Sequence, residues 1–300
     1  MFLQQLINGL TIGAVYALIA VGYTMVYGIV ELINFAHGEI YMMATFVAMT
    51  LFRLAGYPLW FAAPAAIVAA MMMGVTLEYI AYRPLRRSPR LVALISAIGA
   101  SLFLQNLAMK IWGARRQPFL DPERPLAFFQ VKHQLALPAV GEATFSNMQI
   151  TILGTAVAMM IFLTLLIGKT KLGRAMRACA QDQVAAKLMG VNVDRTISAT
   201  FAIGSAMAAV AGVLVGMNYN QVWPMMGYMA GLKAFTAAVL GGIGNMPGAF
   251  VGGLVLGLAE GFAGAYVSSL WMDAIAFGIL IIVLIYRPSG ILGQQIPRRT

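Results

Sequence analysis

The sequence predicts an all-α, polytopic membrane protein with eight to ten transmembrane spans, some of them short or broken. Of its 300 residues, 61% are hydrophobic and only 10% are charged, against roughly 45–50% and about 25% in a soluble domain. Mean hydropathy is +0.83. Stretches such as 150–167 and 275–285 are apolar on every face, whereas strands of a membrane β-barrel alternate polar and apolar residues. This composition excludes a soluble enzyme, a nucleic-acid-binding domain and a disordered regulator.

Spans are predicted wherever about 20 consecutive residues are mostly apolar. Two of these stretches, 40–56 and 228–243, are short, and Gly and Pro crowd around the second. Irregular backbone at membrane depth has to be buried in protein or line a cavity. We therefore treat residues 1–300 as one membrane domain, with predicted spans at 8–30, 40–56, 59–80, 91–112, 149–168, 196–218, 228–243, 247–266 and 270–287.

The basic residues predict the orientation, although the formal net charge of +10 would suggest nucleic acid in a soluble protein. Most of the 20 Lys and Arg residues fall in segments 81–90 and 169–195 and in the tail after Tyr286. Positive loops stay in the cytoplasm, so we place these segments and the C-terminus there. Segment 113–148 mixes both charge signs with several prolines and is predicted to be an irregular external loop. Residues 1–52 contain no basic residue, so the side of the N-terminus stays open.

The sequence predicts no catalytic site, no metal site and no cofactor bound by this chain. Gly168-Lys169-Thr170 imitates the end of the nucleotide-binding motif G-x-x-x-x-G-K-[ST], but Leu163 stands where its first Gly belongs. We therefore expect this chain not to hydrolyse ATP. His37 and His133 are the only histidines, and neither belongs to a metal-binding pattern.

Ionisable residues inside apolar spans are costly and therefore informative. Glu260 shares a helix face with Gly253 and Gly257, so it should face protein or a cavity, either as a structural carboxylate or as a pathway residue. Lys233, near Thr236, either extends toward the lipid headgroups or lines the mouth of a pathway.

Two polar breaks interrupt the apolar runs. The first contains Asn34, His37 and Glu39, and it predicts either a capped turn or the lining of a pathway. The second, residues 241–248, reads as a turn between spans. Both contain Asn and Gly and both precede an apolar helix, which hints at two related halves, as in many transporters. The candidate pathway residues are Asn34, His37, Glu39, Lys233, Thr236 and Glu260.

The basic segment 169–195 is predicted to dock a cytosolic partner. Asp182 suits the first turn of a helix, where the dipole favours negative charge, and Gly190 suits its end. A helix this short is unstable alone, so it needs either a partner surface or the bilayer surface. Small and apolar residues give it a predicted exposed face. The candidate docking residues are Arg174, Arg177, Asp182, Ala185, Ala186, Leu188, Met189, Gly190 and Asp194.

These motifs together resemble the LivH-type permease subunits of bacterial branched-chain amino acid ABC importers. Ala185, Ala186 and Gly190 resemble the importer loop E-A-A-x-x-x-G, although Val184 replaces its Glu, so no ion pair to the ATPase is expected from that position. The other matching stretches are Asn34–Glu39, Ala81–Pro84, Leu94–Gly99, Phe103–Asn106, Gly231–Glu260 and Pro288–Gly293.

The resemblance implies a permease in the bacterial inner membrane that pairs with a second homologous permease subunit. Two cytosolic ATPase subunits would bind ATP and Mg²⁺, and a periplasmic protein would deliver leucine, isoleucine or valine. Two alternatives stay open. A related importer could carry urea, short amides or sugars, and a secondary transporter or channel could use Glu39, Lys233 and Glu260 as coupling or gating charges. A membrane-embedded enzyme is a third, more distant alternative.

Overall fold

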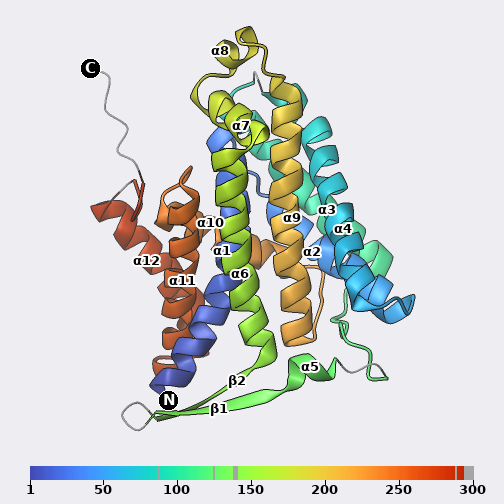
Figure 1. The fold of residues 1–300 in the computed structure, drawn as a ribbon, viewed down its shortest axis with the longest axis vertical. Coiled ribbons are helices and arrows are strands. Elements are labelled where there is room, and N and C mark those ends of the chain that lie inside the picture. The colour runs from blue at the N-terminus through green and yellow to red at the C-terminus, as the bar shows by residue number, and fades with distance from the viewer. Residues whose placement is uncertain (87, 124–125, 138–140, 288, 294–300) are drawn as a thin grey trace.

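The computed structural model describes residues 1–86, 88–123, 126–137, 141–287 and 289–293, and helices make up most of them (Figure 1). The first half contains α1 (Phe2–Val30), α2 (His37–Met49), α3 (Leu59–Leu77), α4 (Arg90–Trp112) and α5 (Ala127–Gln130). A hairpin of β1 (Lys132–Leu137) and β2 (Gly141–Ser146) follows. The second half contains α6 (Asn147–Lys169), α7 (Lys171–Gln181), α8 (Gln183–Leu188), α9 (Val193–Tyr219), α10 (Met226–Gly241), α11 (Met246–Tyr266) and α12 (Met272–Tyr286). Short π and 3₁₀ segments extend α2 and α3 and precede α12.

Within the described residues, seven helical segments are long and apolar enough to cross a membrane. The predicted count of eight to ten is therefore approximate. The two stretches predicted to be short form α2, with 13 residues, and α10, with 16. At 1.5 Å per residue or less, α2 and the π segment Thr50–Leu54 that continues it extend for at most about 27 Å, whereas the hydrocarbon core is about 30 Å thick. Both short helices therefore depend on the long helices for burial.

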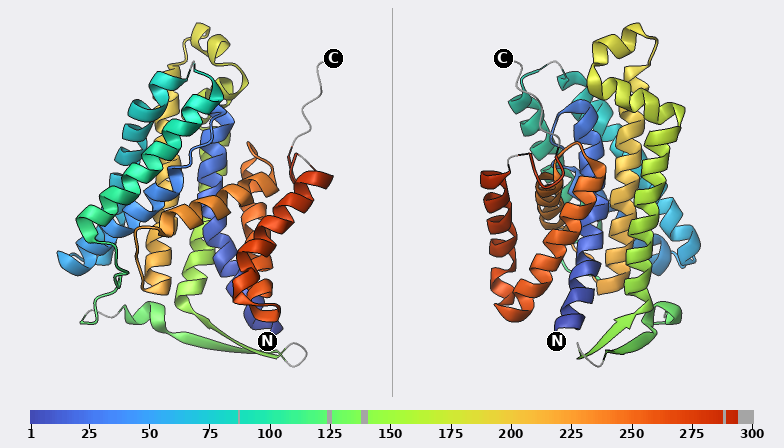
Figure 2. Two further views of the ribbon diagram at one scale, coloured as in Figure 1. Left: turned by 180° about the vertical axis from the view of Figure 1, so that it is seen from behind. Right: turned by 60° about the vertical axis from the view of Figure 1, so that its left-hand side comes forward.

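The molecule has two distinct ends (Figures 1 and 2). The end that is predicted to dock a partner, which we call the docking end, carries α7, α8 and the connection from α3 to α4, and α12 runs toward it. The hairpin end carries the N-terminus with β1 and β2. The basic segments 81–90 and 169–195 thus lie at the same end, as their charge predicts, whereas Arg298 and Arg299 of the tail fall outside the described residues.

The prediction that segment 113–148 is irregular is wrong in part. It contains α5 and an antiparallel hairpin, which runs from the pair Lys132 and Ser146 to the pair Leu137 and Gly141. Cross-strand contacts stabilise such a pair, and here the His133 ring stacks on Phe145 with centroids 5.4 Å apart. None of the prolines of this segment lies within β1 or β2.

Glycines bring helix backbones into contact across the interior. A Cβ added at Gly257 of α11 would lie 2.1 Å from the backbone nitrogen of Gly13 in α1, and one at Gly261 would lie 2.8 Å from Cα of Gly9. Small residues at four-residue spacing allow this approach, because van der Waals contact replaces the hydrophobic drive that is missing in lipid. The glycine stripe of α11 is therefore used for packing within this chain.

The order of helix lengths repeats, although the two polar breaks are not equivalent in this repeat, because the first leads into α2 and the second leads into α11. The long–short–long series α1, α2, α3 recurs as α9, α10, α11, and α1 and α9 run in opposite directions (Figure 1). The contacts follow the same symmetry: α1 packs on α11 as α3 packs on α9, and α1 contacts α9 as α2 contacts α10. Transporters built in this way place their sites where the two repeats meet.

Gly257→Val tests the packing of α1 against α11. The added side chain meets backbone atoms, which cannot rotate away, so we expect a loss of about 1–3 kcal/mol or more in stability. Gly154→Val in α6 is the control, since nothing lies within 4 Å of its added Cβ. Fluorescence-detected size-exclusion chromatography should show less folded monodisperse protein for Gly257→Val alone. Equal yields of the two variants would contradict the tight packing.

Candidate functional site

The two short helices cross with their backbones in contact. A Cβ added at Gly38 of α2 would lie 2.2 Å from the carbonyl oxygen of Gly227 and 2.8 Å from Cα of Gly231, both in α10. Any side chain at Gly38 would push the helices apart. This crossing brings the first polar break next to the N-terminal half of α10.

Glu39, one residue further along α2, is fully buried at this crossing. Its Oε1 accepts hydrogen bonds from Ser101 Oγ at 3.1 Å and from Gln105 Nε2 at 2.8 Å. These residues lie four apart on one face of α4. Glu39 Oε2 lies against Gly227 and has no hydrogen-bond partner among the described residues. No ion pair to Glu39 occurs there either, so two hydrogen bonds orient its carboxyl group and no cation among these residues is paired with it.

A cavity of about 380 Å³ lies beside this carboxylate. It is amphipathic, with Tyr23 and both donors to Glu39 on its polar side and mostly aliphatic and aromatic side chains elsewhere. Its lining residues are Tyr23, Phe35, Ile98, Ser101, Leu102, Gln105, Met225, Tyr228 and Leu232. The pathway prediction for Glu39 therefore has a cavity to which it applies.

Three other pathway candidates, two in the first break and one in α10, have structural contacts. The buried His37 ring packs edge-on against Tyr23, with ring centroids 4.7 Å apart. Asn34 Oδ1 accepts a hydrogen bond from the Tyr82 hydroxyl at 2.9 Å. Thr236 is buried and donates to the carbonyl of Leu232 in its own helix at 2.9 Å. None of the three candidates lines this cavity.

Lys233 and Glu260 form a buried ion pair that the sequence did not predict. Lys233 Nζ lies 3.0 Å from Glu260 Oε1 and 2.7 Å from Asp273 Oδ1. Tyr16 donates to Glu260 Oε2 at 2.9 Å. Glu260 faces protein, as its glycine neighbours predicted. Through these ion pairs Lys233 joins α10 to α11 and α12, and it borders a second cavity of about 280 Å³.

Helix α8 has both of its predicted termini. The Asp182 side chain caps it by accepting from the backbone N–H groups of Val184 at 2.7 Å and Ala185 at 3.0 Å. Gly190 has a φ of +84°, a left-handed conformation that Gly adopts without steric cost. The Val191 N–H then bonds back to the Ala186 carbonyl at 3.0 Å. The prediction that Gly190 ends this helix is confirmed.

The exposed apolar face of α8 differs slightly from the prediction. Val184, Leu188 and Met189 are 71%, 83% and 85% exposed, and Ala185 is exposed as well. Ala186 is buried, so it belongs to the inner face, and its predicted exposure is wrong. Its small side chain fits against the main body of the molecule.

The basic residues of α7 lie on its outer face. Arg174 and Arg177 are exposed, and Arg177 also donates to the carbonyl of Ile167 at the end of α6. The inner face of α7 packs against the end of α1 through Met176 and Cys179. This leaves the Arg174 guanidinium facing away from the protein.

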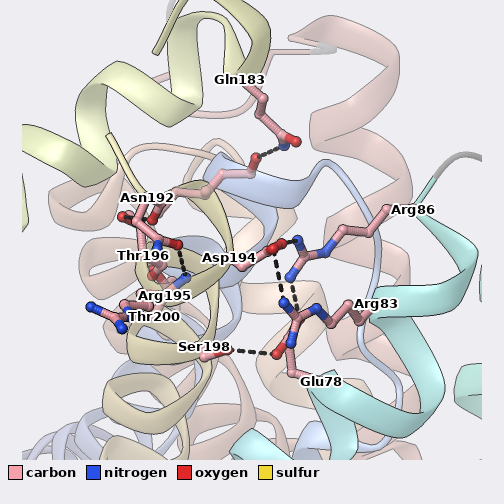
Figure 3. A network of polar contacts seen from close by, with 11 residues as sticks. Glu78, Arg83, Arg86, Gln183, Asn192, Asp194, Arg195, Thr196, Ser198 and Thr200 are labelled. Atoms are coloured by element: carbon pink, nitrogen blue, oxygen red, sulfur yellow. Dashed lines mark hydrogen bonds and ion pairs between the residues drawn. The ribbon is translucent and has the colours of Figure 1, made fainter. Parts of the chain in front are cut away.

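A network of charges at the docking end joins α3 to α9 (Figure 3). Asp194 lies 2.8 Å from Arg83 and 2.6 Å from Arg86. Arg86 also pairs with the buried Glu78, which accepts from Ser198 Oγ at 2.7 Å. Asp194 was predicted to dock a partner, but the structure uses its carboxylate in these internal ion pairs.

A hydrogen bond ties α8 to the end of α1. Gln183 Nε2 donates to the carbonyl oxygen of Ile29 at 3.0 Å (Figure 3). Ala186 lies in the same buried cluster as Val26 and Ile29 of α1. The docking helix is therefore attached to the last turn of α1, directly before the break that leads to Glu39.

Sequence analysis did not predict several of these contacts, because they join residues that are far apart in the sequence. Nothing local associates Gln183 with Ile29, or Lys233 with Asp273. Ser101 and Gln105 were within reach of sequence analysis, because two polar residues four apart in an apolar span share one helix face. Tyr16 gives no such signal.

Comparison with known proteins shows the family of this chain. The family model described as "Branched-chain amino acid transport system / permease component" matches residues 5–285. The chain belongs to this family. It is 48% identical to the high-affinity branched-chain amino acid transport system permease protein LivH of Escherichia coli K12, over 98% of this chain and 96% of that protein.

Two further known proteins are similar to this permease. It is also 48% identical to the permease protein BraD of Pseudomonas aeruginosa, with the same coverage of 98% and 96%. Among solved structures, PsaBC from Streptococcus pneumoniae aligns with 96% of this chain and 93% of its own at a TM-score of 0.47 and 14% identity. The family match and the seven apolar helical segments among the described residues make the permease a multi-pass membrane protein of a transport family.

Substitutions at the buried ion pair of Lys233 and Glu260 should reduce stability by unequal amounts. Lys233→Met leaves the Glu260 carboxylate without a cation, which costs about 3–5 kcal/mol for a buried pair. Glu260→Gln costs less, because Lys233 keeps Asp273. The double variant should regain most of the stability lost by Lys233→Met.

Unfolding temperatures measured with a thiol-reactive coumarin maleimide report these differences in stability. Cys179 is the only cysteine in the sequence. Its thiol is buried, and burial raises its pKa. The dye therefore reacts with this thiol when unfolding exposes it. A double variant that is no more stable than Lys233→Met would contradict the pairing.

Proposed function

We propose that this permease is the membrane subunit of a binding-protein-dependent ABC importer for leucine, isoleucine and valine. The observation that carries the proposal is the 48% identity to LivH and BraD over nearly the full length of both chains. The cavity beside Glu39 supports it, because it combines an apolar wall with a polar side, and aliphatic amino acids have the same two parts.

In this proposal the docking end faces the cytoplasm, together with the C-terminus, and binds one of the two ATPase subunits that dock beneath the pair of permease subunits. The exposed apolar residues of α8 and the exposed Arg174 of α7 form the contact surface. Since the sequence has no nucleotide-binding motif, ATP and Mg²⁺ bind to those partner subunits. The hairpin end then faces the periplasm and receives a substrate-binding protein.

A second homologous permease subunit covers the face formed by α4 and α10. Leu102 and Tyr228 on that face are about half exposed, and the cavity between them opens outward. A buried carboxylate close to lipid is unfavourable, so a protein partner is the better neighbour for this face. The translocation pathway then runs between the two subunits, beside Glu39.

Uptake by the complete importer in proteoliposomes tests the proposed function. Labelled leucine should enter only with ATP and loaded binding protein, and unlabelled isoleucine and valine should compete with it. Competition by urea or xylose, with none by isoleucine or valine, would support the related importers instead. Uptake without ATPase subunits would indicate a secondary transporter or a channel.

Gly190→Val tests docking through α8. A β-branched residue in a left-handed conformation costs about 1–2 kcal/mol, too little to unfold the bundle but enough to alter a six-residue helix. Gly168→Val is the control, because it lies at the same end of the molecule with nothing within 4 Å of its added Cβ. We expect Gly190→Val alone to reduce co-purified ATPase and substrate-stimulated ATP hydrolysis. Normal coupling in this variant would exclude α8 as the docking element.

A further inference from the structure

We propose that the cavity beside Glu39 is a binding subsite for a free zwitterionic amino acid in transit. The ammonium group would lie on the side of Glu39, the carboxylate at the N-terminus of α10, and the aliphatic side chain against α4 and α10. The inference rests on the proposed function and specifies which part of the permease recognises the substrate. The volume of about 380 Å³ lies in the range of small-molecule sites.

The ammonium group is recognised by acceptor oxygens backed by a negative charge. Ser101 Oγ donates to Glu39, and Gln105 Nε2 donates to both Glu39 and Ser101 Oγ, so the atoms that these residues have left for a ligand are acceptors. Both residues line the cavity. Since no ion pair neutralises Glu39 within the described residues, its carboxylate supplies the counter-charge for an ammonium group.

The carboxylate group is recognised by the positive end of a helix dipole. Met225, the N-cap residue of α10, lines the cavity, and α10 has neither a capping side chain nor an acidic residue in its first turn. Helix N-termini of this kind favour anions. Independently, Tyr23 lines the cavity with a buried hydroxyl whose proton has no acceptor among the described residues, and this hydroxyl can donate to a carboxylate.

The apolar wall accepts an aliphatic side chain. Ile98 and Leu102 of α4 and Leu232 of α10 form it. The wall lacks charged side chains among its described residues, so the subsite discriminates against charged and strongly polar amino acids. The polar groups of the subsite are thus gathered at one side of the cavity, where Glu39 lies against Gly227 in the first turn of α10, and the apolar wall forms the rest.

Two substitutions in the complete reconstituted importer test the subsite. Glu39→Gln keeps the shape and removes the charge, so labelled leucine uptake should fall about ten- to a hundredfold, the usual range for losing a hydrogen-bonded charge. Leu102→Trp fills the cavity and should reduce uptake similarly. Leu91→Trp is the matched control, since Leu91 is also exposed on α4 but does not line the cavity.

ATPase retention should stay normal in all three variants, and Leu91→Trp should also keep hydrolysis stimulated by loaded binding protein, which separates substrate recognition from ATPase assembly. Wild-type uptake in both Glu39→Gln and Leu102→Trp would overturn the subsite while leaving the proposed function intact. Equal loss in Leu91→Trp and Leu102→Trp would also overturn it. Absence of leucine uptake in the wild-type importer would overturn the proposed function itself, and the subsite with it.

Discussion

The contact between Gly38 and α10 is the constraint on which the rest of the molecule depends. Two helices too short to cross a bilayer meet here backbone to backbone, so their ends lie within the protein. Polar backbone groups at this depth are tolerated only when protein or a cavity surrounds them. The long helices satisfy this requirement by packing closely around the pair, α1 against α11 and α3 against α9, through glycines that allow the backbones to touch.

The same constraint connects the docking end to the cavity. Helix α8 is attached to the last turn of α1 through Gln183 and Ala186. The chain then runs into the break, where Tyr82 holds Asn34, and continues into α2 and Glu39. A displacement of α8 by an ATPase would therefore move the end of α1 first. The ion pairs of Asp194 with Arg83 and Arg86 hold α3 and α9 together beside this route.

The sequence predicts the fold class, the two short helices and the termini of α8, because each follows from local chemistry. Apolar length predicts spans, and Gly190 predicts a left-handed stop. Contacts between distant segments were not predictable in this way. Lys233 has two possible behaviours in isolation, and only the fold shows that Glu260 and Asp273 meet it. The hairpin was missed because prolines and mixed charge dominate segment 113–148, while its strands are stabilised by pairing with each other.

The most direct test of this account is a single methyl group at the crossing. Gly38→Ala places a Cβ where the Gly227 carbonyl and the Gly231 backbone already lie, and Gly99→Ala on α4, with nothing within 4 Å of its added Cβ, provides the comparison. Leucine uptake and thermal stability should be measured for both variants in the complete importer. The account predicts that Gly38→Ala loses uptake and stability while Gly99→Ala stays close to wild type. Wild-type uptake and stability in Gly38→Ala would contradict it.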